Sequence, residues 1–313
     1  MKRTVTGICL AFLLAAVSLY LVTLPATETR SWVIPVMGTV CECRFELDGK
    51  NADGALKAVN EAFAEVMGLA NLYDPTSEIS RLNASAHQEP FICSPEMYAL
   101  LKESRKAYIQ SSGSFDISVK PLMDLWGFYR KQGKIPPESD IAKAKRLCGL
   151  DKVVFNDEKR TLSFPQKGMA VDLGGIAKGF ALDLAVEKLI QKNISIKRGT
   201  INLGGNIYLL GKEQIYRIGI KDPSNPDKIK EIVTLQAPGA VSSSGDYERF
   251  VTLEGKKFGH IIDPVTGVPA SRSYAATVFS KSGISADWMS TALYLKGREF
   301  CSAIDCQSWI IEK

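Results

Sequence analysis

The sequence is short of the residues from which zinc sites and nucleic-acid-binding arms are built. It has two histidines in 313 residues, and none of its seven cysteines forms a CxxC pair, which argues against a Cys/His zinc site. The formal net charge of +5 is spread along the chain without a lysine or arginine run, which argues against a nucleic-acid partner. Repeats, low-complexity tracts and Pro/Ser-rich linkers are absent after the first 30 residues. One compact domain at residues 31–313 is therefore expected.

Residues 1–30 have the pattern of an export segment. Lys2 and Arg3 precede an apolar stretch over residues 7–22, and Pro25 follows it. A cleavable signal peptide and a retained membrane anchor both fit this pattern. In either case the positive flank places the rest of the chain outside the cytoplasmic membrane, in the periplasm or on the outer face of that membrane.

Export would allow disulfides among the six cysteines that follow this segment, but the sequence does not select a pairing. Cys301 and Cys306 are the nearest plausible partners. Cys41 and Cys43 alternate along a predicted strand and therefore share one face, where burial as small apolar side chains is the favoured interpretation.

Strand and helix patterns are mixed without regular βαβ alternation, which predicts an α+β fold with mixed or antiparallel sheets. Helices are predicted at residues 51–72, 94–111, 141–148, 183–192 and 285–295. Strands are predicted at residues 32–47 around a turn at 37–39, and at 153–155, 161–164, 200–210, 216–220, 232–236, 241–244, 247–253 and 277–280. Residues 73–83 are interpreted as a loop.

One junction between a predicted strand and a helix has the composition of a phosphate-binding turn. Asp172 precedes Gly174 and Gly175, and Lys178 follows them. Glycines allow close backbone approach, and the first N–H groups of a helix have no intrahelical partner and attract anions. The run matches neither GxGxxG nor the GxxxxGK[ST] loop. Phosphate binding and an ordinary strand-turn-helix corner are both compatible with it.

Three further side chains would share one face of the last predicted helix. Asp287 is followed by Ser290 and Thr291, three and four residues later. Their oxygen atoms suit a hard cation such as Mg²⁺, which takes oxygen ligands. The alternative is an acid that stabilises the helix N-terminus, with Thr291 bonding back to the preceding turn.

The best acid–base candidates are His260 and Asp263, which flank the end of a strand before Pro264. A histidine with no more than a surface role is the competing interpretation for His260. Among the aromatic residues, Tyr73 is expected to stack on a ligand ring, whereas Trp126 and Phe128 are expected in the core.

Eight short motifs follow one another along the chain. They are MGT at 37–39, YDP at 73–75 with SRLN at 80–83, SSGSFD at 111–116 with LWGF at 125–128, DLGGIAKG at 172–179, NLGG at 202–205, SGDY at 244–247, HIIDP at 260–264, and AD at 286–287 with Thr291. Taken together and in this order, they resemble the ApbE family, the FAD:protein FMN transferases.

The resemblance implies an α+β, T-fold-like structure that binds FAD and Mg²⁺. It also implies transfer of FMN from FAD to a threonine or serine hydroxyl of an exported flavoprotein through a phosphoester, with release of AMP. Membrane respiratory complexes with exported domains are the acceptors that the family suggests. The residues implied for the FAD site are Met37, Tyr73, Ser114, Phe115, Asp116, Asp172, Lys178, His260 and Ile262, and those implied around the metal are Gly175, Asp287, Ser290 and Thr291.

The sequence departs from the family pattern in two places. Ser290 stands where some relatives have a second acid or an alanine, and the chain stops soon after the last predicted helix, so that the usual C-terminal strand is expected to be shortened. His260 or Asp263 is expected to act as the base for the incoming alcohol, or to orient that base.

Two other functions remain open from the sequence. A Mg²⁺-dependent FAD diphosphatase would use water in place of the protein hydroxyl and release FMN and AMP. A non-catalytic FAD-binding export protein would hold FAD unchanged, although it would not need the cation-binding pair Asp287 and Thr291.

Overall fold

The structure, a computed structural model, describes residues 27–48, 51–129, 135–245, 250–272, 274–301 and 306–312. Within these ranges strands and helices are mixed along the chain, which confirms the expected α+β class. The main sheet is antiparallel throughout. In sheet order its strands are β1 (Thr27–Val36), β2 (Thr39–Asp48), β6 (Ile196–Leu203), β7 (Asn206–Leu210), β10 (Gly239–Ser244), β13 (Tyr274–Ser280) and β14 (Gln307–Glu312).

Hydrophobic alternation places β2 against the core. Cys41, Cys43, Phe45 and Leu47 are buried, whereas the residues between them face outward. In the two-residue turn before β2, Met37 and Gly38 have positive φ angles of 52° and 69°. Hairpin turns with two such residues have a backbone twist that matches the twist of the strands they join. The thiols of Cys41 and Cys43 lie side by side, with their Sγ atoms 3.7 Å apart. The expected burial of both residues on one face is confirmed.

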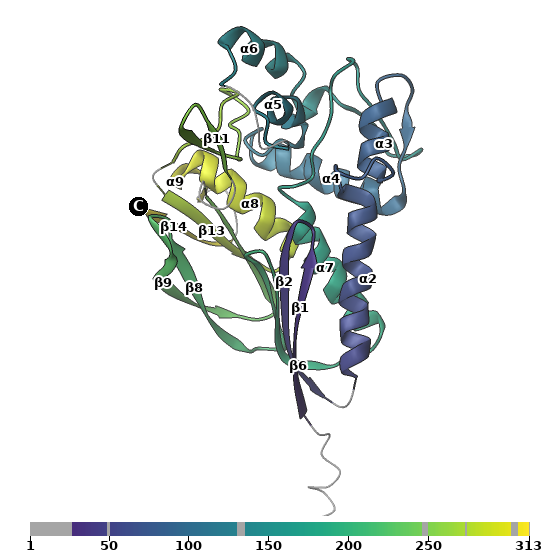
Figure 1. Ribbon diagram of the computed structural model, residues 1–313. Coiled ribbons are helices and arrows are strands. Elements are labelled where there is room, and N and C mark those ends of the chain that lie inside the picture. Colours follow the sequence, from purple (N-terminus) through teal and green to yellow (C-terminus); the bar gives the residue numbers. More distant parts are fainter. Residues whose placement is uncertain are drawn as a thin grey trace, which may run out of the picture.

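Three long helices cover one face of the main sheet (Figure 1): α2 (Ala52–Ala70), α7 (Ala177–Gln191) and α8 (Gly283–Lys296). On α2 the buried residues recur every three or four positions, which is the pattern of a helix with one apolar face. Around these helices lie α3 (Glu78–Ser85), α4 (Pro95–Gln110), α5 (Lys120–Leu125), α6 (Glu138–Arg146), α9 (Arg298–Cys301) and the 3₁₀ turns Ile117–Val119 and Leu150–Lys152.

The prediction of a loop over residues 73–83 was wrong in its second half, because α3 begins at Glu78. Ser77 caps this helix by accepting a hydrogen bond from the Ser80 N–H. The polar run around Pro75 has the composition of a loop, but this loop ends at Ser77, the N-cap of the helix. The helix at 141–148 was also misplaced, since α6 runs from Glu138 to Arg146.

A long hairpin packs on the other face of the main sheet. Its strands are β8 (Ile215–Asp222) and β9 (Asn225–Gln236), paired antiparallel. Their buried residues form a separate cluster with Leu209 and Val241, which alternate with the helix-facing residues of β7 and β10. Two small sheets complete the described fold: β3 (Phe91–Ile92), β5 (Thr161–Ser163) and β4 (Val154–Asn156), and the pair β11 (Phe250–Leu253) and β12 (Lys256–Gly259).

Several expectations fall partly or wholly outside the described residues. These include most of the N-terminal export segment, the start of the strand predicted at 247–253, and the side chain of Cys301 with its suggested pairing. Among the helices that the structure describes, none is long and apolar enough to cross a membrane. The C-terminal strand, expected to be short, is present as β14 and pairs with β13 along Phe279–Tyr274.

The helices α7 and α8 meet through two glycines. A Cβ at Gly179 would lie 2.2 Å from the Gly283 carbonyl oxygen, and a Cβ at Gly283 would lie 2.6 Å from that of Gly179. Both distances are far inside van der Waals contact, so the two backbones touch and no larger residue fits between them. This contact fixes the distance between the starts of the two helices.

We expect Gly179→Ala to destabilise the fold by about 1–3 kcal/mol, because its methyl group overpacks a contact made by backbone on both sides. The matched control is Gly68→Ala in α2, where an added Cβ meets nothing within 4 Å. That change should stabilise the protein by up to about 1 kcal/mol through helix propensity. Urea unfolding of both variants measures the difference, and equal effects would contradict the proposed backbone contact.

Candidate active site

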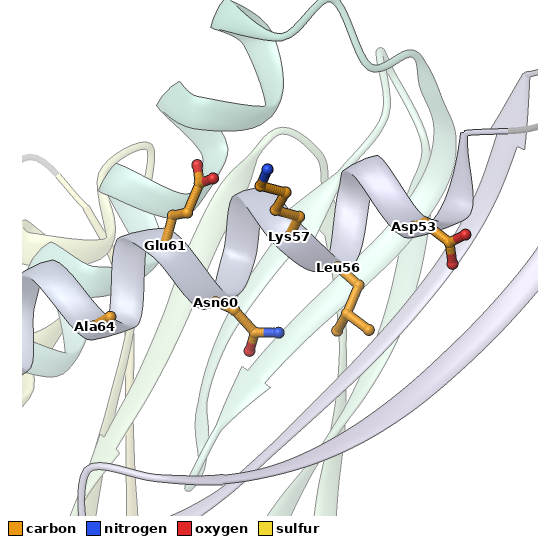
Figure 2. A pocket seen from close by; sticks show the side chains of 6 residues that line it. All are labelled: Asp53, Leu56, Lys57, Asn60, Glu61 and Ala64. Atoms are coloured by element: carbon orange, nitrogen blue, oxygen red, sulfur yellow. The ribbon is translucent and has the colours of Figure 1, made fainter.

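A cavity of about 1290 Å³ is lined by β8, by the ends of β6 and β10 and by residues of the helical layer. Its volume exceeds that of a typical small-ligand pocket, so it has room for a dinucleotide. Its wall is assembled from segments far apart in the sequence: residues 37–39, 71–73, 114–117, 174–178, 202–205, 218–221 and 260–262, together with side chains of β10 and α8. A second hollow is formed by six side chains of α2 alone (Figure 2), and it is a shallow surface depression.

The glycine junction forms one wall of the cavity. Asp172 lies before α7 and accepts a hydrogen bond from the Gly174 N–H through Oδ1 (2.7 Å). Its Oδ2 accepts one from the Tyr129 hydroxyl (2.5 Å). The N-cap position of α7, Ile176, supplies no side-chain hydrogen bond, and Lys178 stands in the first turn. Ala177 and Lys178 line the cavity, so the positive end of the α7 dipole and a cation face it, which suits a phosphate group.

Tyr129 is a site residue that sequence reasoning missed. Its ring makes an edge contact with Tyr73, with centroids 6.3 Å apart, and the Lys120 ammonium lies 4.8 Å from its centroid. Burial raises the pKa of Tyr129 far above its ordinary value, and the charge of Asp172 adds to this effect, so the hydroxyl stays protonated and donates. The neighbouring LWGF motif gave the only signal, and that motif was assigned to the core.

The segment 111–116 forms a second wall. Ser114, Phe115 and Asp116 all line the cavity, and the turn that presents them is held by its own hydroxyl groups. The Phe115 N–H donates to Ser111 Oγ (2.9 Å), and Ser114 Oγ donates to the Ser111 carbonyl (3.0 Å). Burial raises the pKa of Asp116, while hydrogen bonds from Ser118 act in the opposite direction.

Two further motif residues, Met37 and Tyr73, line the cavity. Met37 stands in the β1–β2 turn, and Tyr73 is 74% exposed, which leaves its ring open to a ligand. Trp126 behaves as expected of a core residue: it is 3% exposed and its Nε1–H donates to the Gly267 carbonyl (3.0 Å). Phe128 was expected in the core but is only partly buried and lines the cavity.

The face of α8 brings Asp287 and Thr291 to the cavity. Asp287 Oδ2 accepts a hydrogen bond from the Gly179 N–H (2.9 Å), so the α8 carboxylate is attached to the first turn of α7. Burial raises the pKa of Asp287, and the nearby Lys178 charge lowers it. Ser290 is fully buried behind them and donates from Oγ to the Asp287 carbonyl (2.9 Å), and it does not line the cavity.

Asn206 is a second residue that the sequence reading missed. It is 2% exposed, and its Oδ1 accepts a hydrogen bond from Ser242 Oγ (2.6 Å). Within the described part of the chain its Nδ2 has no hydrogen-bond partner. Burial raises the pKa of Asp287, and Asn206 and Ser242 act in the opposite direction. No sequence pattern pointed to Asn206, because its position near the site depends on the packing of β7 against α8.

These donors fit a hard cation and not a zinc-like one. Asp287 contributes a carboxylate and Thr291 a hydroxyl, and the backbone of Gly175 lines the same cavity. Oxygen donors with few charges suit Mg²⁺, which keeps phosphate or water oxygens in the remaining positions. In the ranges that the structure covers, no three His, Cys, Asp or Glu side chains cluster to form a metal site.

Of the two predicted acid–base residues, the structure places only one on the cavity wall. His260 and Ile262 line the cavity, but Asp263 does not. Asp263 Oδ1 accepts hydrogen bonds from the N–H groups of Val265 (2.9 Å) and Thr266 (3.4 Å), so this carboxylate organises the turn that follows His260.

Comparison with known proteins agrees with this geometry. The ApbE family model matches residues 37–307. A FAD:protein FMN transferase from Vibrio cholerae is 30% identical over 85% of this chain and 80% of its own length, and one from Haemophilus influenzae is 31% identical over 96% and 89%.

Solved structures of relatives have the same fold. The crystal structure of the ApbE protein from Thermotoga maritima has a TM-score of 0.83 at 27% identity and covers 91% of this chain and 94% of its own. The flavin transferase ApbE from Vibrio cholerae has a TM-score of 0.78 at 25% identity, with 92% and 94% covered. The chain therefore belongs to the ApbE family and has the FAD:protein FMN transferase activity of its relatives.

Proposed function

We propose that this transferase moves FMN from FAD to a threonine or serine hydroxyl of an exported flavoprotein, with Mg²⁺ as cofactor and AMP as the second product. The observation that carries the proposal is the meeting of a helix N-terminus, Lys178 and Asp287 in one cavity of dinucleotide size. A diphosphate needs positive charge and N–H donors, and its metal needs oxygen ligands.

The reaction is a displacement at the FMN-side phosphorus. The acceptor oxygen forms a bond to this phosphorus, and the bond to the bridging oxygen breaks, so that AMP leaves with that oxygen. Lys178 and the positive end of the α7 dipole would stabilise the diphosphate oxygens, since charge develops on them in the transition state. Asp287, Thr291 and the Gly175 carbonyl would hold Mg²⁺, while Ser290, which does not line the cavity, would stay outside the ligand set. When bound, the cation would neutralise phosphate charge.

Nine residues are assigned to FAD binding in this proposal. The aromatic and apolar members would contact the flavin and adenine rings, while the polar members would bind the linker between them. They are Met37, Tyr73, Ser114, Phe115, Asp116, Asp172, Lys178, His260 and Ile262, all of which line or border the cavity. Tyr129 joins them through its hydrogen bond to Asp172.

His260 is the proposed base that takes the proton of the acceptor hydroxyl, since it lies on the cavity wall. Asp263 is proposed to orient His260 through the turn that its carboxylate organises. The exported location is likewise a proposal. It is supported by the apolar stretch after Lys2 and Arg3, which fits either a signal peptide or an anchor. A membrane respiratory subunit outside the cytoplasm is the proposed acceptor.

Incubation of the purified enzyme with FAD and an exported flavoprotein subunit tests the transfer. Flavin fluorescence on the acceptor band, AMP in equal amount, and loss of both with EDTA are expected. Asp287→Ala should slow transfer by more than about 100-fold, since a missing metal ligand removes several kcal/mol of stabilisation. Asp227→Ala on the exposed part of β9 is the control. Free FMN without labelled acceptor would indicate a diphosphatase, and unchanged FAD would indicate a binding protein.

A second prediction concerns Lys178. Lys178→Met should raise the KM for FAD by about 10–100-fold, since a hydrogen bond to a charged group contributes about 1.5–3 kcal/mol. Lys188→Met on the same helix is the matched control, because Lys188 pairs with Glu65 on α2 away from the cavity. Steady-state kinetics at saturating acceptor measures the change. An equal KM in the two variants would remove Lys178 from the phosphate site.

A third prediction separates His260 from Asp263. His260→Gln should lower kcat by about 100-fold or more while FAD affinity changes little, as expected for loss of a general base. Asp263→Asn keeps one acceptor oxygen for the turn and should lower kcat less. Single-turnover transfer rates and FAD binding by fluorescence quenching give the two quantities. An unchanged rate in His260→Gln would eliminate this base.

A further inference from the structure

Two carboxylates join α7 and α8, one from each helix. Asp287 of α8 accepts a hydrogen bond from the Gly179 N–H of α7. Asp183 of α7 accepts hydrogen bonds from the start of α8. Because Gly179 and Asp183 are one helical turn apart, as are Gly283 and Asp287, the two contacts lie on consecutive turns of an antiparallel crossing.

Asp183 satisfies the exposed donors of the α8 N-terminus. Its Oδ1 accepts from the Gly283 N–H (2.6 Å), and its Oδ2 accepts from the Ile284 N–H (2.9 Å) and from Ser282 Oγ (2.8 Å). Ser282 is itself the N-cap of α8. A carboxylate at this place also interacts favourably with the helix dipole. Asp183 therefore fixes the first turn of α8 on α7.

The glycine contact leaves this arrangement little freedom. The backbones of Gly179 and Gly283 already touch, so α8 cannot move closer to α7. The three hydrogen bonds to Asp183 prevent α8 from moving away. Asp287 follows Gly283 by one turn, and a small rotation of the α8 start therefore moves its carboxylate directly.

We propose that Asp183 is a positioning residue for the cation: by holding the α8 N-terminus, it places the Asp287 carboxylate and Thr291 hydroxyl opposite the phosphate-binding start of α7. Asp183 does not line the cavity and would touch neither FAD nor the metal. The inference rests on the magnesium site proposed above and assigns to it a residue outside its ligand set. Groups that orient metal ligands commonly affect metal affinity as strongly as some ligands do.

The chain contains a matched control for this carboxylate. Glu78 is 6% exposed and accepts hydrogen bonds from the N–H (2.6 Å) and Oγ (2.7 Å) of Ser94, the N-cap of α4. It is thus a second buried acid that holds the start of a helix. Neither Glu78 nor Ser94 lines the cavity. Replacing Glu78 therefore reports what the loss of such a contact does to stability alone.

The experiment compares Asp183→Asn with Glu78→Gln by isothermal titration of Mg²⁺ into the FAD-bound protein without acceptor, together with the Tm of each variant. Both substitutions should lower the Tm. Asp183→Asn should raise the Kd for Mg²⁺ by about tenfold or more, whereas Glu78→Gln should leave it within about twofold. FAD affinity without Mg²⁺ should be unchanged in both.

Each other result has a definite meaning. A lower Tm with an unchanged Mg²⁺ Kd in Asp183→Asn would overturn the positioning role, as would an equal rise in Glu78→Gln. Absence of Mg²⁺ binding in the unaltered protein would overturn the magnesium site itself, and the inference with it. If Asp183→Asn does not fold, Ser282→Ala removes one of the three hydrogen bonds and should raise the Kd by a smaller factor. An unchanged Kd in that variant would again contradict the proposal.

Discussion

The contact between α7 and α8 is the constraint on which the site depends. The start of α7 places Lys178 on the cavity wall, while α8 places the Asp287 carboxylate and the Thr291 hydroxyl there. These two halves are separated by more than a hundred residues, and the hydrogen bond from Gly179 to Asp287 joins them. Because Gly179 and Gly283 allow the two backbones to touch, the start of α7 and the Asp287 carboxylate lie side by side in one cavity.

The antiparallel sheet explains how the remaining motifs reach this place. In such a sheet every second connection lies at the same end, so the turns at residues 37–39 and 202–205 lie together with the end of β10. The β8–β9 hairpin closes the cavity from the opposite face of the sheet, through residues 218–221. Each of the eight motifs therefore contributes at least one residue to a single cavity.

Local patterns predicted what depends on local forces. Three elements were predicted correctly from such patterns: α2 from its apolar period, α4 from its serine cap and proline, and β2 from its alternation of buried and exposed residues. The cap of α3 at Ser77 was also present but was obscured by the polar run before it. The roles of Tyr129 and Asn206 could not be read in the same way. Each depends on a contact distant in sequence: the Tyr129 hydroxyl donates to Asp172, and Asn206 accepts from Ser242 Oγ. Position in a motif likewise did not reveal that Asp263 is not a lining residue and accepts hydrogen bonds from the N–H groups of the following turn instead.

The paired thiols of β2 have a consequence for the chemistry of this chain. The hydrogen bond with Cys41 and burial together hold the pKa of the Cys43 thiol well above its ordinary value. At neutral pH such a sulfur stays protonated, and a protonated sulfur is a poor nucleophile. Both side chains are also almost fully shielded from solvent. The pair is therefore unreactive in the folded protein: thiol–disulfide exchange and oxidation by peroxides would both require the strand to open first.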